Sequence, residues 1–299
     1  MGTFGQTEHD VTNLFPKGKK FDYDGHTYQV IISGKPKPPR GECKTDAYIK
    51  VVDEDGNYRE FKISIKQDNA EFLENKMSLE RAKEIFGEDA QDIIRKSIAT
   101  VKDNFLNDYL VYIEGARRTE PKCIKLGWKF EFLRYDGGKR AGKIVLTREQ
   151  KLNIYAGTEL NEGKRNCWVG DSIIEDSGVA NMYVEIGADE VSLKNVLSKM
   201  IPIEEFVDSQ DSDLCFACKA LNYRAVPDKW DGDRPLAVYV DWKLENRIMT
   251  GKIVLNQPLE HKGNEIGKKV QQILKQLGIT EKNFSDIKKH LAPGTNVSE

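Results

Sequence analysis

The sequence predicts a mixed α/β protein, and three patterns support this fold class. Alternation of apolar and polar residues, which is typical of strands, runs through residues 21–34 and 44–67. Apolar residues at helical spacing follow in residues 72–105 and return near the C-terminal end, while residues 123–255 again favour strands. This order of elements indicates α/β or α+β packing, in which helices cover sheets.

The composition is typical of a soluble globular protein. Of the 299 residues, 39% are hydrophobic and 31% are charged, so the chain can bury a substantial core. The formal charge of −2 neither requires nor excludes a nucleic-acid partner. No segment has the pattern of a signal peptide or a membrane span, so we expect no membrane association and, by default, a cytoplasmic location.

The first strand pair is predicted in "FDYDGHTYQVIISG", residues 21–34, with its turn at Asp24-Gly25. The next segment, "KPKPPRGE", contains three prolines. Because proline lacks a backbone N–H, this segment predicts a rigid loop outside the sheet. The loop leads into a second hairpin, "KTDAYIKVVDEDGNYREFKISIKQ", residues 44–67.

Both strands of the second hairpin have one face suited to the core. Successive side chains of a strand point to opposite faces, so alternating apolar residues define a buried face and the residues between them a polar face. The apolar residues are Ala47, Ile49, Val51, Phe61, Ile63 and Ile65. Asp46 and Lys66 stand at the ends of the two strands, and the turn decides whether they share a face.

Two turn geometries give different registers for this hairpin. A two-residue loop would set Asp46 opposite Ile65, which would place the carboxylate among the core residues. A three-residue loop at residues 54–56, with glycine in the left-handed position, sets Asp46 opposite Ser64 and diagonal to Lys66. We expect the second register, in which the carboxylate and the ammonium share the polar face.

Helices are predicted after this hairpin and at the end of the chain. Ser78 and Gly87 suit the N-cap and C-cap of one helix, and a longer helix is expected from Asp89 towards Phe105. Two further helices are expected at residues 266–277 and 280–291.

The strand-rich region contains two similar segments, each pairing a Trp-Lys-x-Glu strand with a Gly-Lys-Ile-Val-Leu strand. They suggest a repeated hairpin, although coincidence is equally consistent because short strands reuse few residue types. We expect a core in residues 1–122 and a β-rich recognition or dimerisation region with the terminal helices in residues 123–299. The two could form one compact unit.

Asp46 and Lys66 on one face are either ordinary surface charges or two parts of a metal-dependent active site. A carboxylate at a strand end can hold Mg²⁺, with the backbone carbonyl of Ile65 and a phosphate oxygen as further ligands. The metal would polarise the phosphate and generate hydroxide, while Lys66 would position the attacking water or neutralise charge in the transition state. Hydrolysis of a phosphodiester needs these parts and no covalent intermediate.

Asp46, followed after seventeen residues by Ser64-Ile65-Lys66, resembles the Asp…(Asp/Glu)-x-Lys hairpin of the PD-(D/E)xK nuclease superfamily. Within it, "GECKTDAYI" followed by "FKISIK" is most similar to type II restriction endonucleases. The resemblance covers residues 41–80. It implies a restriction-endonuclease-like fold, a central mixed sheet flanked by helices, and a Mg²⁺-dependent endonuclease acting on double-stranded DNA.

The sequence departs from the family pattern in two places. Thr45 replaces the usual proline, and Ser64 stands where the second acidic ligand is expected. A subgroup of restriction enzymes has a Ser-x-Lys strand and takes the missing carboxylate from the following helix. With the same thirteen residues after Lys66, this position is Glu80. The resemblance therefore implies Glu80 as the second metal carboxylate, with Ser64 bonded to a metal-bound water.

Other residues remain open for these roles. Glu71 and Glu74 would reach the metal if the chain turns directly after the strand. Glu42 and Gln67, beside the strand ends, are candidates for orienting water or a second ion. Glu80 also has an ordinary explanation, because the helix dipole favours glutamate near a helix N-terminus.

A nuclease must also hold a polyanion, and pairs of cationic residues occur in predicted loops. The candidate DNA-binding residues are Arg117, Arg118, Lys139, Arg140, Lys164 and Arg165. Each is also explained as a solvated loop charge, so clustering around Asp46 would be needed to form a DNA groove. Trp168 and Trp230, near such loops, would either stack on bases or pack in the core.

These observations predict a Mg²⁺-dependent endodeoxyribonuclease, a sequence-specific restriction enzyme. The resemblance implies a homodimer, because a two-fold protein matches a palindromic target. Two alternatives remain: a superfamily nuclease acting on DNA structure in repair, recombination or phage metabolism, and a non-catalytic DNA-binding protein. A divalent metal at Asp46 would separate the nucleases from the binding protein.

Overall fold

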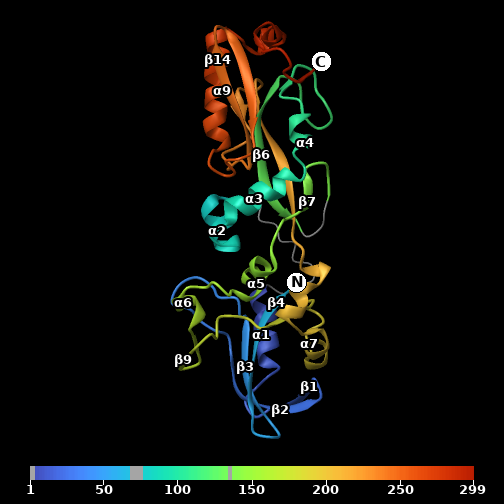
Figure 1. Ribbon diagram of the computed structural model, residues 1–299, viewed down its shortest axis with the longest axis vertical. Helices are drawn as coiled ribbons and strands as arrows, with labels where there is room; N and C mark the ends of the chain where they lie inside the picture. Colours follow the sequence, from blue (N-terminus) through green and yellow to red (C-terminus); the bar gives the residue numbers. More distant parts are fainter. Residues whose placement is uncertain (1–3, 68–76, 134–136) are drawn as a thin grey trace. The chain divides into compact units, whose positions relative to one another are not determined.

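The computed structural model describes residues 4–67, 77–133 and 137–299 (Figure 1). Helices alternate with antiparallel and parallel strand pairs in these residues, so the expected mixed α/β class is confirmed. None of the helices within the described ranges is both long and apolar enough to cross a membrane.

The chain forms two compact units, each built from two separate stretches. The first comprises the described residues of 1–71 and 146–213, and the second those of 72–145 and 214–299. These units differ from the expected division between 1–122 and 123–299, because the chain builds part of the second unit and then returns to the first. A linear division of the sequence cannot represent such a path.

The first unit contains a six-stranded sheet in the order β1-β2-β3-β4-β10-β11. Its strands are β1 (Lys20–Tyr23), β2 (His26–Gly34), β3 (Ala47–Asp53), β4 (Tyr58–Lys66), β10 (Met182–Glu185) and β11 (Ile201–Pro202). A small separate hairpin consists of β8 (Cys167–Val169) and β9 (Ser172–Ile174). The helices are α1 (Phe4–Asn13), α5 (Arg148–Ala156), α6 (Glu162–Arg165), α7 (Leu193–Lys199), α8 (Ile203–Asp208) and the short 3₁₀ turn η1 (Gln210–Ser212). Because β10 runs parallel to β4 whereas its other neighbour is antiparallel, the sheet is mixed.

The predicted register of the second hairpin is confirmed. Ala47 pairs with Ile63 and Val52 with Tyr58, as the three-residue loop requires, and Asp46 directly precedes these paired residues, with its N–H donating to the Ile63 carbonyl. Residues 54–56 form a three-residue loop, and its Gly56 has the left-handed φ of 84° that favours glycine.

Both faces of the central strands are covered by helices. On one face the apolar residues of β3 and β4 form a core with Val11 of α1 and Val196 of α7. On the other face Tyr183 of β10 lies beside Ser64 and stacks on Phe206 of α8. Ser64 is consequently only 1% exposed. The face predicted as polar is therefore covered at Ser64 and is not a solvent surface there.

The second unit contains a larger sheet with the main order β13-β12-β6-β14-β15. Its strands are β5 (Val111–Tyr112), β6 (Cys123–Leu133), β7 (Ala141–Lys143), β12 (Cys215–Arg224), β13 (Lys229–Trp230), β14 (Val238–Glu245), β15 (Ile248–Val254) and β16 (Val297–Ser298). Its helices are α2 (Leu79–Phe86), α3 (Ala90–Ala99), α4 (Asp103–Leu106), α9 (Gly263–Leu277) and the 3₁₀ segment η2 (Glu281–His290).

Local signals in this unit are partly confirmed. The hydroxyl of Ser78 accepts the N–H of Arg81 and Gly87 follows the last turn, so both predicted caps of α2 are correct. The long helix expected from Asp89 is instead divided into α3 and α4.

The suggested repeat of hairpins is wrong. β14 pairs with β15, but β6 pairs along ten residues of β12, and β7 pairs with the same strand. The longer pairing with β12 takes up the edge of β6 that a local hairpin would need.

Candidate active site

Asp46 stands at the start of β3, where its carboxylate is tied to the facing strand. Its backbone N–H donates to the carbonyl of Ile63 (2.8 Å), and its Oδ2 accepts the backbone N–H of Ile65 (2.8 Å). In a strand the N–H and the carbonyl of one residue point to the same side. The Ile65 carbonyl therefore faces Asp46, as the expected second oxygen ligand should.

Burial perturbs the Asp46 carboxylate. Desolvation raises its pKa to about 6, although the Lys66 ammonium and the Ile65 N–H favour the charged form and oppose the rise. The charge of Lys66 thus acts on the Asp46 carboxylate, which agrees with the predicted placement of both residues at the same end of the hairpin. A carboxylate that is costly to ionise alone is suited to gaining a cation.

Asp46 opens into a cavity of about 250 Å³ beside the proline-rich loop. Its lining residues are Glu8, Lys35, Pro36, Lys37, Pro38, Gly41, Glu42, Cys43, Thr45 and Asp46. Two carboxylates besides Asp46 therefore line this cavity, Glu8 from α1 and Glu42 from the loop.

Lys35 connects the acidic groups of this cavity. Its ammonium donates to Oε2 of Glu8. Burial works to lower the pKa of Lys35, but the bond to Glu8 and the charges of Glu8, Asp46 and Glu42 outweigh it, and the pKa is raised. The four charged groups thus form one electrostatic cluster, although they come from α1, the loop and the start of β3.

Glu8 is a site residue that the sequence analysis missed. Helix α1 is held against the end of β4, because the Gln67 side chain donates to the hydroxyl of Thr7 (2.7 Å) and both residues are buried. This bond occupies the Gln67 amide that was considered for orienting water. No local pattern around Glu8 marks it, since its proximity to Asp46 depends on the docking of α1.

Glu185 is a second acidic residue that was missed. β10 runs parallel to β4 with Tyr183 beside Ser64 and Glu185 beside Lys66. Adjacent residues in register share a sheet face, so Glu185 is on the face of Lys66 and Asp46. The signal for it would have been the strand pattern of residues 182–185, but its pairing with β4 is not readable from sequence.

The remaining glutamate candidates are not brought to Asp46 by the described structure. Glu71 and Glu74 lie outside the described residues. Glu80 belongs to the second unit, where the side-chain hydroxyl of its neighbour Ser78 and backbone N–H groups lower its pKa. This is the helix-capping role that was the ordinary explanation, and its metal role stays a prediction.

The predicted DNA-binding cations differ in their surroundings. Arg117 and Arg118 are exposed in a tight turn closed by two hydrogen bonds between Ala116 and Thr119 (both 3.0 Å). Lys139 is also exposed, and Lys164 lies against Gly41 of the cavity loop.

The two remaining arginines have internal partners. Arg140 bonds the buried carboxylate of Asp108 (2.6 Å), and Arg165 bonds Asp176 (3.0 Å). Lys164 and Arg165 belong to the same unit as Asp46, whereas the other four cations belong to the second unit. Their role in binding DNA stays a prediction.

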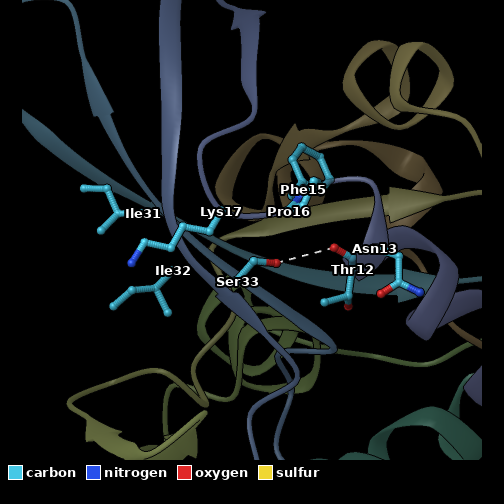
Figure 2. A pocket seen from close by; sticks show the side chains of 8 residues that line it. All are labelled: Thr12, Asn13, Phe15, Pro16, Lys17, Ile31, Ile32 and Ser33. Atoms are coloured by element: carbon cyan, nitrogen blue, oxygen red, sulfur yellow. Dashed lines mark hydrogen bonds between the residues drawn. The ribbon is translucent and has the colours of Figure 1, made fainter.

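Two other cavities lack this combination of groups. One, of about 360 Å³, lies between the end of α1 and β2, where the Ser33 hydroxyl donates to the Thr12 carbonyl (3.4 Å), as Figure 2 shows. Lys17 supplies its charge, and Ile31 and Ile32 contribute apolar walls. The other, of about 740 Å³, lies in the second unit beside α9. Neither cavity contains Asp46, the carboxylate that the sequence analysis selected.

The donor groups around Asp46 fit a hard divalent cation. Carboxylate and carbonyl oxygens are the ligands that Mg²⁺ prefers, and it usually keeps several waters. The buried hydroxyl of Thr45 lines the same cavity and finds no hydrogen-bond partner among the residues that the structure describes. Such an orphaned hydroxyl suits a metal-bound water.

The described residues contain no ready-made group of three or more His, Cys, Asp or Glu side chains for a metal. Mg²⁺ does not need one, because it is commonly held by one or two carboxylates plus substrate phosphates.

Comparison of the chain with protein-family models, with curated proteins and with solved structures finds no match.

Proposed function

We propose that this protein is a Mg²⁺-dependent endodeoxyribonuclease that hydrolyses phosphodiester bonds in double-stranded DNA. The observation that carries the proposal is the Asp46 carboxylate. Its pKa is raised to about 6 and its Oδ2 is held by the Ile65 N–H, with Lys66 close by. Besides this cation, Asp46 faces a cavity that is also lined by the carboxylates of Glu8 and Glu42 and the hydroxyl of Thr45.

The residues have separate roles in this mechanism. Asp46 and the Ile65 carbonyl would hold Mg²⁺, which supplies an activated water and charge neutralisation at the phosphate. Lys66 places a positive charge beside the scissile phosphate and stabilises the added negative charge of the transition state. Thr45, whose hydroxyl lines the cavity, would orient water beside Asp46, and Ser64 stays a candidate for the same role.

Glu8 is our first choice for the second carboxylate, because it lines the same cavity as Asp46. Lys35 donates a hydrogen bond to Glu8. When a cation binds, this bond would either break and release the carboxylate to the metal or persist and keep the carboxylate oriented. Glu80 remains the choice that the family resemblance implies. Substitution of each by glutamine, followed by titration of cleavage against Mg²⁺ concentration, distinguishes the two, because loss of a ligand raises the concentration required.

The finer assignment is a type II restriction enzyme that acts as a homodimer, and it rests on the resemblance of residues 41–80. A nuclease acting on DNA structure would use the same site. Discrete fragments from a long DNA support the restriction enzyme, whereas a preference for branched or interrupted DNA supports the alternative.

The test is cleavage of supercoiled plasmid with Mg²⁺. We expect wild-type protein to cut, and Asp46→Ala or Lys66→Ala to lower the rate by at least about a hundredfold, because each removes a group that acts on the transition state. Lys50→Ala is the matched control: Lys50 lies on the same hairpin and face, paired with Glu60 (3.6 Å), and its loss should leave the rate unchanged.

The catalytic proposal fails if the plasmid stays intact with wild-type protein, or if the Asp46 and Lys66 variants cut as fast as the Lys50 control. Retarded migration of intact DNA on a gel would then favour the non-catalytic DNA-binding protein.

A further inference from the structure

An exposed row of three side chains lies on the small hairpin beside the cavity. Trp168 of β8 and Ile173 of β9 are opposed across the hairpin and are 46% and 58% exposed. On its other side Trp168 pairs with Lys37, with backbone bonds in both directions (2.9 and 3.1 Å). Directly opposed residues share a face. Lys37, Trp168 and Ile173 therefore form one row, here called the Trp168 row.

The opposite face of this small sheet is packed into the first unit. Cys167, Val169 and Pro36 are buried, and the Cys167 N–H donates to the hydroxyl of Ser177 (3.0 Å). The hairpin is thus anchored on one face, and the exposure of the Trp168 row on the other does not come from a loose segment. An exposed tryptophan on a rigid support is unusual, because packing is its commoner fate.

The Trp168 row is continuous with the candidate active site. Lys37 belongs to the row and also lines the cavity that contains Asp46. Lys37 therefore brings a positive charge to both the row and the cavity, while the acidic residue of the hairpin, Asp171, lies in the turn between Val169 and Ser172. A polyanion approaching Asp46 is favoured on the Lys37 side of the ring.

We infer that the Trp168 row is a stacking platform for an unpaired base next to the phosphate that Asp46 and Lys66 act on. An exposed aromatic ring beside a cation is the combination that binds single-stranded nucleic acid, since the ring stacks on a base and the cation contacts the phosphate. The bases of an intact duplex have no free face for such a ring. The substrate class is double-stranded DNA that carries unpaired bases at an end, gap or junction, which corresponds to the nuclease acting on DNA structure and not to the restriction enzyme.

This inference rests on the proposed nuclease function and is tested by binding, without cleavage. The Asp46→Ala protein is titrated against three fluorescein-labelled DNAs: a blunt duplex, the same duplex with an unpaired tail, and the tail alone. Adding Trp168→Ala should weaken binding of the two DNAs with unpaired bases by about tenfold, the size of a lost base–aromatic stack, and leave the blunt duplex unchanged.

Three further variants isolate stacking from folding. Trp168→Phe keeps an aromatic face and should retain most of the affinity, whereas Trp168→Leu keeps apolar volume without that face and should bind as weakly as alanine. Tyr58→Ala is the matched control, because Tyr58 is an aromatic residue of the same unit that is 70% exposed on the first part of β4. It should leave all three affinities unchanged.

An equal loss on all three DNAs, or no loss on any of them, overturns the inference. If wild-type protein cleaves DNA but the Trp168 variants bind like their parent, the inference alone fails. If Trp168 supports binding of the tailed duplex while wild-type protein cleaves nothing, the nuclease proposal alone fails. Absence of all DNA binding overturns both.

Discussion

Asp46 shows how one residue can be costly to the fold and useful to a site. Its carboxylate is ionised at neutral pH although burial raises its pKa to about 6. Asp46 therefore binds a proton more tightly in the folded state than in the unfolded chain, where the pKa of an aspartate is about 3.9. A ligand cation would remove this penalty, which is the arrangement expected of a binding site.

The sign of this penalty gives a stability prediction for Asp46→Asn. Because the folded pKa is raised, wild-type stability is full below about pH 4 and declines as pH rises through about 6. Without metal at pH 8 the variant should be more stable by about 1–2 kcal/mol, a value reduced from the full shift because the carboxylate is partly exposed. At pH 4 the difference should vanish.

Urea unfolding at both pH values measures this difference, and Asp55→Asn, on the turn of the same hairpin, is the control. A variant that is less stable than wild type at pH 8 would contradict the origin assigned to the pKa shift.

At the scale of elements, the site depends on how α1 docks against β4. Glu8 belongs to this helix and lines the cavity. The residue before it, Thr7, accepts a buried hydrogen bond from Gln67 (2.7 Å), and this bond holds the helix in place. Neither residue touches the cavity. Their bond holds a helix that supplies a charged group to it.

A double-mutant cycle of Thr7→Val and Gln67→Leu tests this docking. Each single change should destabilise the protein by about 1–3 kcal/mol, because it leaves a buried polar group without its partner, whereas the double change should cost less than the sum. The free energy of unfolding is measured for all four proteins. Additive effects would show that the two side chains do not interact.

At the scale of the whole molecule, the proposed binding of DNA depends on where the positive charges lie. Overall charge is only −2, so attraction must come from local groups. Arg117 and Arg118 project from an exposed turn, while Arg140 neutralises the buried Asp108 together with Lys125. Arg117 and Arg118 are therefore suited to contacting phosphates, whereas Arg140 is suited to stabilising the interior of the second unit.

We therefore expect the double variant Arg117→Ala/Arg118→Ala to weaken DNA binding alike for all sequences. The negative slope of log affinity against log salt concentration should become shallower by about 1–2. The reason is that binding with fewer phosphate contacts releases fewer counterions from the DNA. Fluorescence anisotropy across a salt series measures this slope.

Arg95→Ala is the control for this slope, since Arg95 is an exposed arginine of the same unit that pairs with Asp92. An unchanged slope in the double variant would exclude Arg117 and Arg118 from the DNA contact.

The local geometry of the hairpin that carries Asp46 was predictable from the residues of that hairpin. Turn chemistry at Gly56 and the alternation of β3 and β4 set Ala47 opposite Ile63 and brought Asp46 to the end of β4, because a hairpin register depends on residues close in the chain. The caps of α2 were readable for the same reason.

The surroundings of this hairpin depend on contacts between distant parts of the chain. Glu8 and Glu185 reach the face or cavity of Asp46 through the docking of α1 and the parallel pairing of β10, and the partners of β6 and the path of the chain between two units were likewise unpredictable. These arrangements join residues far apart in sequence, and they are selected by the burial of whole faces, for which no short stretch of sequence carries a signal.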